Sequence, residues 1–395
     1  MSAGSPLVTD LVRQEIAASA RLLVVKVGTR VLTADDGRLD HQQVARIAEQ
    51  LCALRSQGRQ VVLVSSGAVG AGVGQLGLAR RPTDLAHLQA VAAVGQARLI
   101  EAYDRVLSRF GIVSAQVLLT ADDLDHRTRY LNVRNTLRCL LEYGALPIVN
   151  ENDTVAVDEL MLTFGDNDAL AARVTNLLCA PLLVILSDVA GLYDGDPKNP
   201  NARLVDVVWK IDRKVEQWVS DGRSQWTRGG MASKLRAAKA VTAAGENVII
   251  AGGRQPDVLV RIMRGEPVGT LFVAQGKSVD PRRRWIGFSA RPRGTIVADA
   301  GACRALVHQG RSLLPIGVVS VQGQFRKGDV VSVCDPSGKE IARGLTNYGS
   351  DEVERIRGLH SHQIAERLGH RPYEELIHRD NLLVWAADEA DELGA

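Results

Sequence analysis

Short runs of branched apolar residues alternate with longer stretches of helical spacing between residues 20 and 275. Runs that are apolar at nearly every position are typical of strands buried on both faces of a parallel sheet. The predicted strands are 22–27, 61–66, 113–119, 145–150, 182–187 and 247–253. Helices are expected at 40–57, 85–110, 127–143, 167–179 and 232–245. The alternation predicts an α/β domain whose mostly parallel sheet has helices on both faces.

The pattern changes after residue 275. From 284 to 384 short Val-rich runs are separated by Gly, Asp and Pro turns, such as the "DPSG" turn at 335–338. Many short strands with frequent turn signals are typical of a small β-barrel. We therefore expect two domains, 20–275 and 284–384, with their boundary in the stretch 274–284.

Polar residues follow four of the predicted strands, at the ends that parallel strands bring to one edge of a sheet. They are "KVGT" (26–29), "SSGA" (65–68), "NEND" (150–153) and "SDVAG" (187–191). Lys26 lies in an otherwise apolar strand, and a buried charge there needs an anionic partner. Asp166, Asn167 and Asp168 open a helix and exceed what one N-cap requires, so at least one of them is expected to face a ligand.

The stretch "RGGMASKLRAAKAV" (228–241) places Gly229 and Gly230 directly before a helix and Lys234 in its first turn. Paired glycines let the backbone approach an anion, and a helix start offers unpaired N–H groups. This predicts a phosphate site, although a glycine turn before a surface helix has the same pattern. Two better-known nucleotide-binding motifs occur only in part. "GKS" (276–278) lacks the first glycine of a P-loop. "GVGQLG" (72–77) begins several residues after its strand ends, too far for the tight turn of a dinucleotide-binding site.

Composition narrows the class of protein. The net charge of +3 does not by itself indicate a nucleic-acid partner, and the basic cluster "PRRRW" (281–285) is interpreted as a solvated face. The five cysteines form no C-x-x-C pair, which argues against a disulfide framework and a structural zinc site. No signal peptide or membrane-spanning run is visible, so we expect a cytoplasmic protein without membrane contact.

Several motifs in one order make the chain resemble the amino-acid kinase superfamily: "KVGT", "SSGAVGAG", "PIVNEND", "FGDNDALAA", "LSDVAGLYDGDP" and "GGMASKLRAAKAV". The segment that begins at "VADAGACRAL" resembles a PUA domain, a small barrel also found in RNA-modifying enzymes. The resemblance implies a three-layer α/β/α kinase domain followed by a PUA-like domain. The appended PUA-like domain points to the branch of the superfamily that phosphorylates glutamate and opens proline synthesis.

The resemblance also implies a reaction in which the γ-carboxylate of L-glutamate attacks the γ-phosphate of MgATP. A carboxylate is ionised at pH 7, so no general base is needed, and charge neutralisation supplies the catalysis. By resemblance the catalytic residues are Lys26, Asp168 and Lys234, and glutamate is held by Ser66, Asp153 and Asn167. The expected ATP-binding residues are Lys26, Ser187, Asp188, Arg228, Gly229, Gly230, Met231, Ala232, Ser233 and Lys234. Mg²⁺ is expected to bind mainly to the phosphates, without a dedicated protein metal site.

Two positions depart from the family pattern, because relatives often have serine at Arg30 and threonine at Arg228. Two alternatives stay open: a kinase for aspartate or acetylglutamate, or an RNA-binding regulatory protein that uses the PUA-like domain. The resemblance further implies a homo-oligomer, feedback inhibition by proline, and transfer of the labile product to a γ-glutamyl phosphate reductase.

Overall fold

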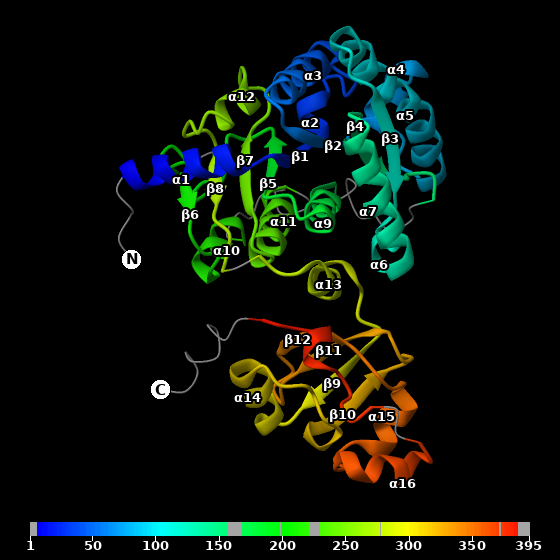
Figure 1. Cartoon of the computed structure of the whole chain (residues 1–395). Helices are drawn as coiled ribbons and strands as arrows, with labels where there is room; N and C mark the ends of the chain where they lie inside the picture. The colour runs from blue at the N-terminus through cyan, green and yellow to red at the C-terminus, as the bar shows by residue number, and fades with distance from the viewer. Residues whose placement is uncertain are drawn as a thin grey trace. The chain divides into compact units, whose positions relative to one another are not determined.

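The computed structural model describes residues 6–155, 167–197, 199–220, 230–276, 278–370 and 373–385. The chain divides into two compact units, which Figure 1 shows with their elements labelled. The first consists of residues 1–124 and 128–278, and the second of residues 125–127 and 279–395. Among the described helices none is long and apolar enough to cross a membrane.

The first unit is built on an eight-stranded sheet with the strand order β3-β4-β2-β1-β5-β7-β8-β6. The six strands from β3 to β7 run parallel to one another, whereas β8 pairs antiparallel with β7. The strands are β1 (Leu22–Val27), β2 (Gln60–Ser65), β3 (Ser114–Leu119), β4 (Leu146–Glu151), β5 (Leu182–Ser187), β6 (Val207–Val208), β7 (Asn247–Gly252) and β8 (Thr270–Phe272). The mostly parallel sheet expected from the apolar runs is confirmed, with strand bounds shifted by at most one residue.

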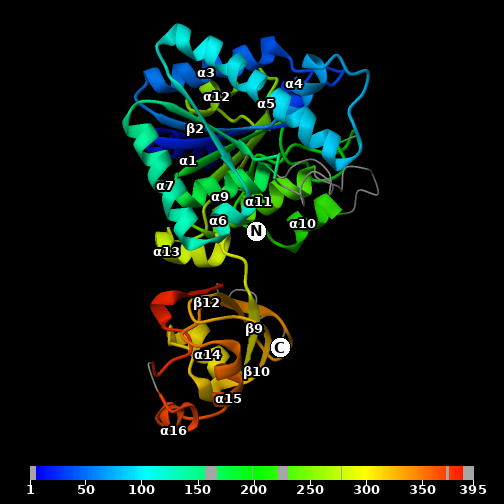
Figure 2. The ribbon, with the colours of Figure 1, turned by 90° about the vertical axis from the view of Figure 1, so that its right-hand side faces the viewer.

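Helices cover both faces of this sheet, as the two views in Figures 1 and 2 show. The helices α3 (His41–Ser56), α5 (Leu85–Leu107) and α12 (Val258–Ile262) lie on one face, and α9 (Asn167–Leu178) and α11 (Met231–Ala243) on the other. Helix α3 forms because Asp40 caps its first turn and Val44, Ile47, Leu51 and Leu54 bury one stripe of its surface. The three-layer α/β/α architecture is therefore confirmed.

Further helices among the described residues of the first unit are α1 (Pro6–Ser19), α2 (Thr29–Leu32), α4 (Ala68–Gln75) and α10 (Arg213–Ser220). The chain passes the boundary between the units at the end of α6 (Ala121–Asp125) and at the first residue of α7 (Arg127–Glu142).

The "GVGQLG" stretch begins inside α4, where its first glycine lets this helix pack closely against α5. A Cβ on Gly72 would lie 1.9 Å from the carbonyl oxygen of Val91, and one on Gly95 would lie 1.8 Å from the carbonyl oxygen of Ala68. Helices α4 and α5 can therefore cross this closely only with glycine at both positions.

The order of the strands places a ligand-binding edge at β1 and β5. These two strands are neighbours, but the chain leaves β1 toward β2 and leaves β5 toward β7, in opposite directions along the sheet. Crevices at such switch points, outside the carboxyl ends of the strands, are where ligands bind in open α/β sheets. A backbone hydrogen bond joins the ends of β1 and β5, because the Gly28 amide donates to the carbonyl oxygen of Leu186 at 3.1 Å.

The second unit contains a five-stranded mixed sheet with the order β10-β9-β11-β12-β13. Its strands are β9 (Gly294–Ala298), β10 (Val318–Gly323), β11 (Val330–Cys334), β12 (Glu340–Leu345) and β13 (Leu382–Val384), and its helices are α13 (Pro281–Arg284), α14 (Ala300–Gln309), α15 (Ser350–Ile356) and α16 (Ile364–Leu368). The prediction that "PRRRW" (281–285) forms a solvated face is wrong for two of its residues. Arg284 and Trp285 are buried, and the Arg284 Nε donates to the carbonyl of Val279 at 2.6 Å.

Candidate active site

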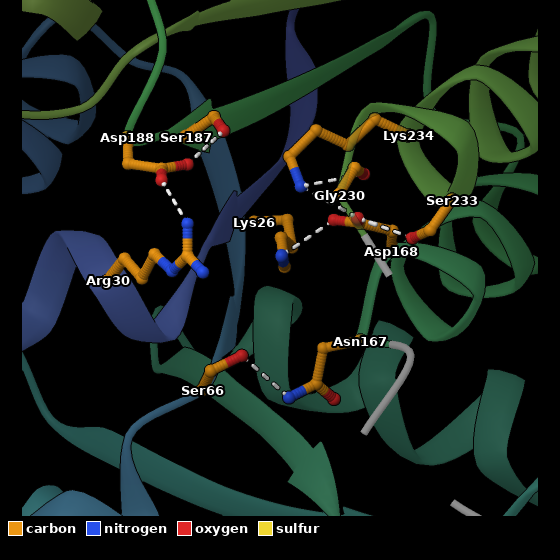
Figure 3. Close-up of polar contacts among 10 residues, drawn as sticks. All are labelled: Lys26, Arg30, Ser66, Asn167, Asp168, Ser187, Asp188, Gly230, Ser233 and Lys234. Atoms are coloured by element: carbon orange, nitrogen blue, oxygen red, sulfur yellow. Dashed lines mark hydrogen bonds and ion pairs between the residues drawn. The ribbon is translucent and has the colours of Figure 1, made fainter. Parts of the chain in front are cut away.

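A buried cluster of opposite charges lies at the switch point. Lys26 comes from the end of β1, Asp168 from the first turn of α9 and Lys234 from the first turn of α11. Lys26 Nζ lies 2.6 Å from Asp168 Oδ1, and Lys234 Nζ lies 3.2 Å from Asp168 Oδ2. Figure 3 shows the three side chains converging from their separate elements. We call these three residues the lysine–aspartate centre.

The electrostatics of this centre favour charged groups. Burial alone would raise the pKa of the Asp168 carboxyl, but Lys26 and Lys234 outweigh it and lower that pKa to about 2. Burial, together with the positive charge of Lys26, lowers the pKa of Lys234, and Asp168 opposes this shift. Two ammonium groups around one carboxylate leave a net positive charge in the absence of ligand. Such a centre suits an anion with oxygen atoms to share between the two lysines.

The start of α11 lies directly against this centre. Ser233 Oγ donates to Asp168 Oδ2 at 2.7 Å, and Lys234 Nζ donates to the carbonyl oxygen of Gly230 at 3.4 Å. Gly230 is the N-cap residue of α11 and makes no side-chain capping hydrogen bond. The start of a helix favours an anion because its N–H groups and its dipole both point toward the ligand. Arg228, Gly229 and Asp166 lie outside the described residues, so their expected roles stay predictions.

A second polar group lies on the other side of Lys26. Asn167 Nδ2 donates to Ser66 Oγ at 2.8 Å and to Asn150 Oδ1 at 3.1 Å. Asn150 in turn donates to Gln96 Oε1 at 2.7 Å. Two of the expected glutamate-binding residues, Ser66 and Asn167, are thus in direct contact, and Figure 3 shows this pair below the lysine–aspartate centre.

Asp153, the third expected glutamate-binding residue, lies two residues beyond the end of β4 and is half-buried. Its carboxylate acts electrostatically on Arg81. The pKa of the Arg81 guanidinium is lowered by burial, which Asp153 partly opposes. A carboxylate and a guanidinium near one another offer partners for both charged groups of an amino acid.

An open pocket adjoins the centre on the side of β5. Its lining includes Lys234 and Gly230 from the start of α11, and Ser187 and Asp188 from the end of β5. The Ser187 hydroxyl donates to Asp188 Oδ1 at 3.0 Å. Apolar and aromatic residues form much of the remaining wall: Val189, Leu192, Tyr193, Pro197, Trp218, Val219 and Met231. The pocket therefore combines a charged part with an apolar surface, as a nucleotide requires.

Some residues of these sites escaped the sequence analysis. Gln96 lies in the helix predicted at 85–110 from its apolar spacing, whereas Trp218 lies in α10, for which no helix is predicted from the sequence. Arg30 is predicted only as a departure from the family pattern. Asn150 belongs to the "NEND" motif (150–153), but the sequence did not assign it a role in binding. Proximity across elements identifies these residues, and no local spacing could have found Gln96 or Trp218.

Within the described part of the chain, no group of three or more His, Cys, Asp or Glu side chains could hold a metal ion. Asp168 already contacts two ammonium groups and the Ser233 hydroxyl, so its oxygens are occupied. Asp188 and Asp196 are carboxylates in the lining of the pocket. These donors fit a hard cation bound mainly by phosphate oxygens and water.

Comparison with known proteins agrees with this geometry. The sequence profile of the amino acid kinase family matches residues 21–252, and that of the PUA domain matches residues 294–368. A glutamate 5-kinase of Rhodopirellula baltica is 52% identical over 94% of this chain and 96% of its own length. The glutamate 5-kinases of Geobacter sp. strain M21 and Bordetella petrii are each 48% identical, over 94% and 96% of this chain and 100% of their own lengths. The chain therefore belongs to the amino acid kinase family, within the group of the glutamate 5-kinases, and carries a PUA domain after the kinase domain.

Proposed function

We propose that this protein phosphorylates the γ-carboxylate of L-glutamate with ATP, giving γ-glutamyl phosphate and ADP, the first step of proline synthesis. The lysine–aspartate centre is the structural observation that carries the chemistry, and the near-complete match to glutamate 5-kinases carries the choice of substrate. A γ-carboxylate oxygen forms a bond to the γ-phosphorus, and the bond from that phosphorus to the bridging oxygen of ADP breaks. The reaction joins two anions, so positioning and charge neutralisation limit its rate.

Each member of the centre has a proposed part in this step. Lys26 and Lys234 neutralise the transferring phosphoryl group from two sides, where negative charge spreads over its oxygens. Asp168 holds both ammonium groups in place before the substrates arrive. The low pKa of Asp168 keeps that anchor ionised at neutral pH. The charges are therefore already oriented when phosphoryl transfer begins.

The substrates occupy the two sides of the centre. Ser66, Asn167 and Asp153 hold glutamate, with Ser66 and Asn167 fixed by their mutual hydrogen bond. ATP lies in the pocket beside Ser187 and Asp188, and residues 228–234, which include the first turn of α11, contact its phosphates. Mg²⁺ bound to the phosphates would reduce their negative charge, and Asp188 is a carboxylate of the pocket lining that would approach it.

The wider biology of the family completes the proposal. We expect a cytoplasmic homo-oligomer that is inhibited by proline at or near the glutamate site. We also expect its acyl phosphate to be consumed by γ-glutamyl phosphate reductase, because such mixed anhydrides hydrolyse readily.

A hydroxylamine-trapping assay tests the function directly, because hydroxylamine converts an acyl phosphate into a stable coloured hydroxamate. The purified protein is supplied with ATP, Mg²⁺ and, in turn, L-glutamate, L-aspartate or N-acetyl-L-glutamate. We expect hydroxamate with L-glutamate far above the level with the other two acids. Asp168→Asn, prepared in parallel, controls for contaminating kinases. A higher yield from aspartate or acetylglutamate would reassign the substrate.

A further inference from the structure

Arg30 occupies a prominent position in the nucleotide pocket. It lies in α2, two residues after Gly28 at the end of β1, and its side chain lines the same pocket as Lys234. Its Nη1 lies 3.0 Å from Asp188 Oδ2, so an ion pair joins the residues that follow β1 and β5 (Figure 3). The guanidinium therefore lies at the switch point itself, beside the proposed path of the phosphates.

The backbone around Arg30 is held firmly, whereas its side chain is accessible. Arg254 donates to the carbonyl of Thr33 at 2.5 Å and forms an ion pair with Asp40 at 3.3 Å, which anchors the end of α2. The Arg30 side chain is 67% exposed and that of Asp188 is 33% exposed. An exposed ion pair of this kind contributes little to stability, so it can be exchanged for a stronger partner.

A polyphosphate is such a partner. A guanidinium binds two oxygens of a phosphate group at once, and the multiple charge of ATP makes this contact stronger than one with a single carboxylate. When Arg30 leaves, Asp188 keeps its hydrogen bond from the Ser187 hydroxyl. The Asp188 carboxylate therefore keeps a hydrogen-bond partner when Arg30 turns to the phosphates.

We propose that Arg30 binds the polyphosphate of ATP, and that its ion pair with Asp188 holds the guanidinium in position until the nucleotide arrives. The inference rests on the proposed function, because it names a further residue that holds the nucleotide in the same pocket. It makes Arg30 a determinant of ATP affinity, in addition to the phosphate contacts proposed for Lys26, Lys234 and the start of α11.

Calorimetric titration of the full-length protein with ATP, ADP and adenosine, with Mg²⁺ and without glutamate, tests this inference. We expect Arg30→Ser to weaken ATP and ADP binding by about tenfold, as the loss of one charge-assisted contact does. Adenosine binding should stay unchanged, and Arg30→Lys should fall between Arg30→Ser and the unaltered protein. Arg105→Ser is the matched control, because Arg105 is 73% exposed, pairs with Glu101 on α5 and lies outside the pocket lining.

The same titration in an Asp188→Asn background separates direct contact from positioning. If Arg30 acted only by orienting Asp188, the Arg30→Ser change would have no further effect there. A direct phosphate contact instead predicts a loss of about tenfold in both backgrounds.

Three results would overturn the inference: unchanged ATP affinity in Arg30→Ser, an equal loss for adenosine, or no effect of Arg30→Ser in the Asp188→Asn background. Each leaves the proposed function standing, provided that the unaltered protein binds ATP. If the unaltered protein fails to bind ATP, the proposed function fails and the role of Arg30 fails with it.

Discussion

Two ion-pair groups lie close together in the same cleft, and they differ in burial more than in distance. In the lysine–aspartate centre the closest contact is 2.6 Å, and the side chains of Lys26, Asp168 and Lys234 are only 7%, 4% and 10% exposed. The Arg30–Asp188 pair has a similar contact of 3.0 Å, but its side chains are 67% and 33% exposed. Solvent therefore screens the second group and hardly reaches the first.

This difference has consequences for what each group can do. Removing one partner from a buried group leaves an uncompensated charge, so the group keeps its arrangement before and after substrate binding. An exposed pair can separate at little cost, because water replaces the lost partner. The buried centre is thus suited to a charge distribution fixed in advance, and the exposed pair to binding by exchange.

The largest expected effect comes from Asp168→Asn. This change removes the anion that pairs with two buried ammonium groups, and we expect the free energy of unfolding to fall by about 3–5 kcal/mol. Urea denaturation followed by circular dichroism measures it. Asp188→Asn, which breaks the exposed pair, is the control and should change that free energy by less than about 1 kcal/mol. Equal effects of the two substitutions would remove the distinction between the two groups.

The pH dependence of that loss sharpens the comparison. The pKa of Asp168 in the folded protein is about 2, below its ordinary value of 3.8. A lowered folded-state pKa stabilises the fold above the unfolded-state value, and this stabilisation is lost as the pH falls toward the folded-state value. The gap in unfolding free energy between the unaltered protein and Asp168→Asn should therefore be constant from about pH 8 to 5 and shrink below about pH 4. A gap that already closes between about pH 7 and 5 would contradict the assignment.

Lys234→Ala should lower kcat by about 10²–10³, equivalent to about 3–4 kcal/mol, while ATP affinity changes modestly. Lys234 is proposed to meet charge that reaches the γ-phosphoryl group only during transfer. Lys234→Arg should restore little, since a planar guanidinium does not fit the place of a compact ammonium. Single-turnover phosphoryl transfer gives the rate and calorimetry the affinity.

Lys239→Ala is the matched control for this variant. Lys239 lies on the same helix, pairs with Glu216 at 2.8 Å and is 54% exposed. A near-normal transfer rate in Lys234→Ala, or an equal loss in Lys239→Ala, would exclude the proposed role.

Asp153→Ala should act on one substrate alone. It removes a carboxylate assigned to glutamate and none that lines the ATP pocket, so the KM for glutamate should rise about tenfold or more. The KM for ATP should stay within about twofold. Steady-state kinetics with each substrate varied in turn provides both constants. Similar increases for both substrates would show that Asp153 supports the whole cleft.

The smallest effect is expected from deleting residues 276–395. Every residue of the proposed centre and of the two substrate sites precedes this segment, and the second unit has its own core. The shortened protein should therefore keep nearly all of its kinase activity in the trapping assay. A folded, monodisperse fragment 1–275 without activity would show that the second unit is needed to complete the site.

The sequence alone determined the architecture of the kinase domain to a considerable degree. Runs such as 22–27 and 182–187 are short and almost continuously apolar, a pattern typical of central strands in a covered sheet. Lys26 stood out for the same reason, since a charge in such a strand requires a partner. The glycines before α11 indicated an anion site from local chemistry alone.

The partner of each charged side chain follows from the packing of distant elements against one another. Asp168 is 142 positions from Lys26 and 66 from Lys234, and the strand order with its switch point at β1 and β5 brings them together. The same applies to Gln96 with Asn150 and to Arg30 with Asp188, which no local spacing links. Burial was equally undetermined: Arg284 was expected to be solvated and is enclosed. The physical reason is that strand and helix periods depend on neighbours along the chain, whereas ion pairing and desolvation depend on contacts between residues that only folding brings close.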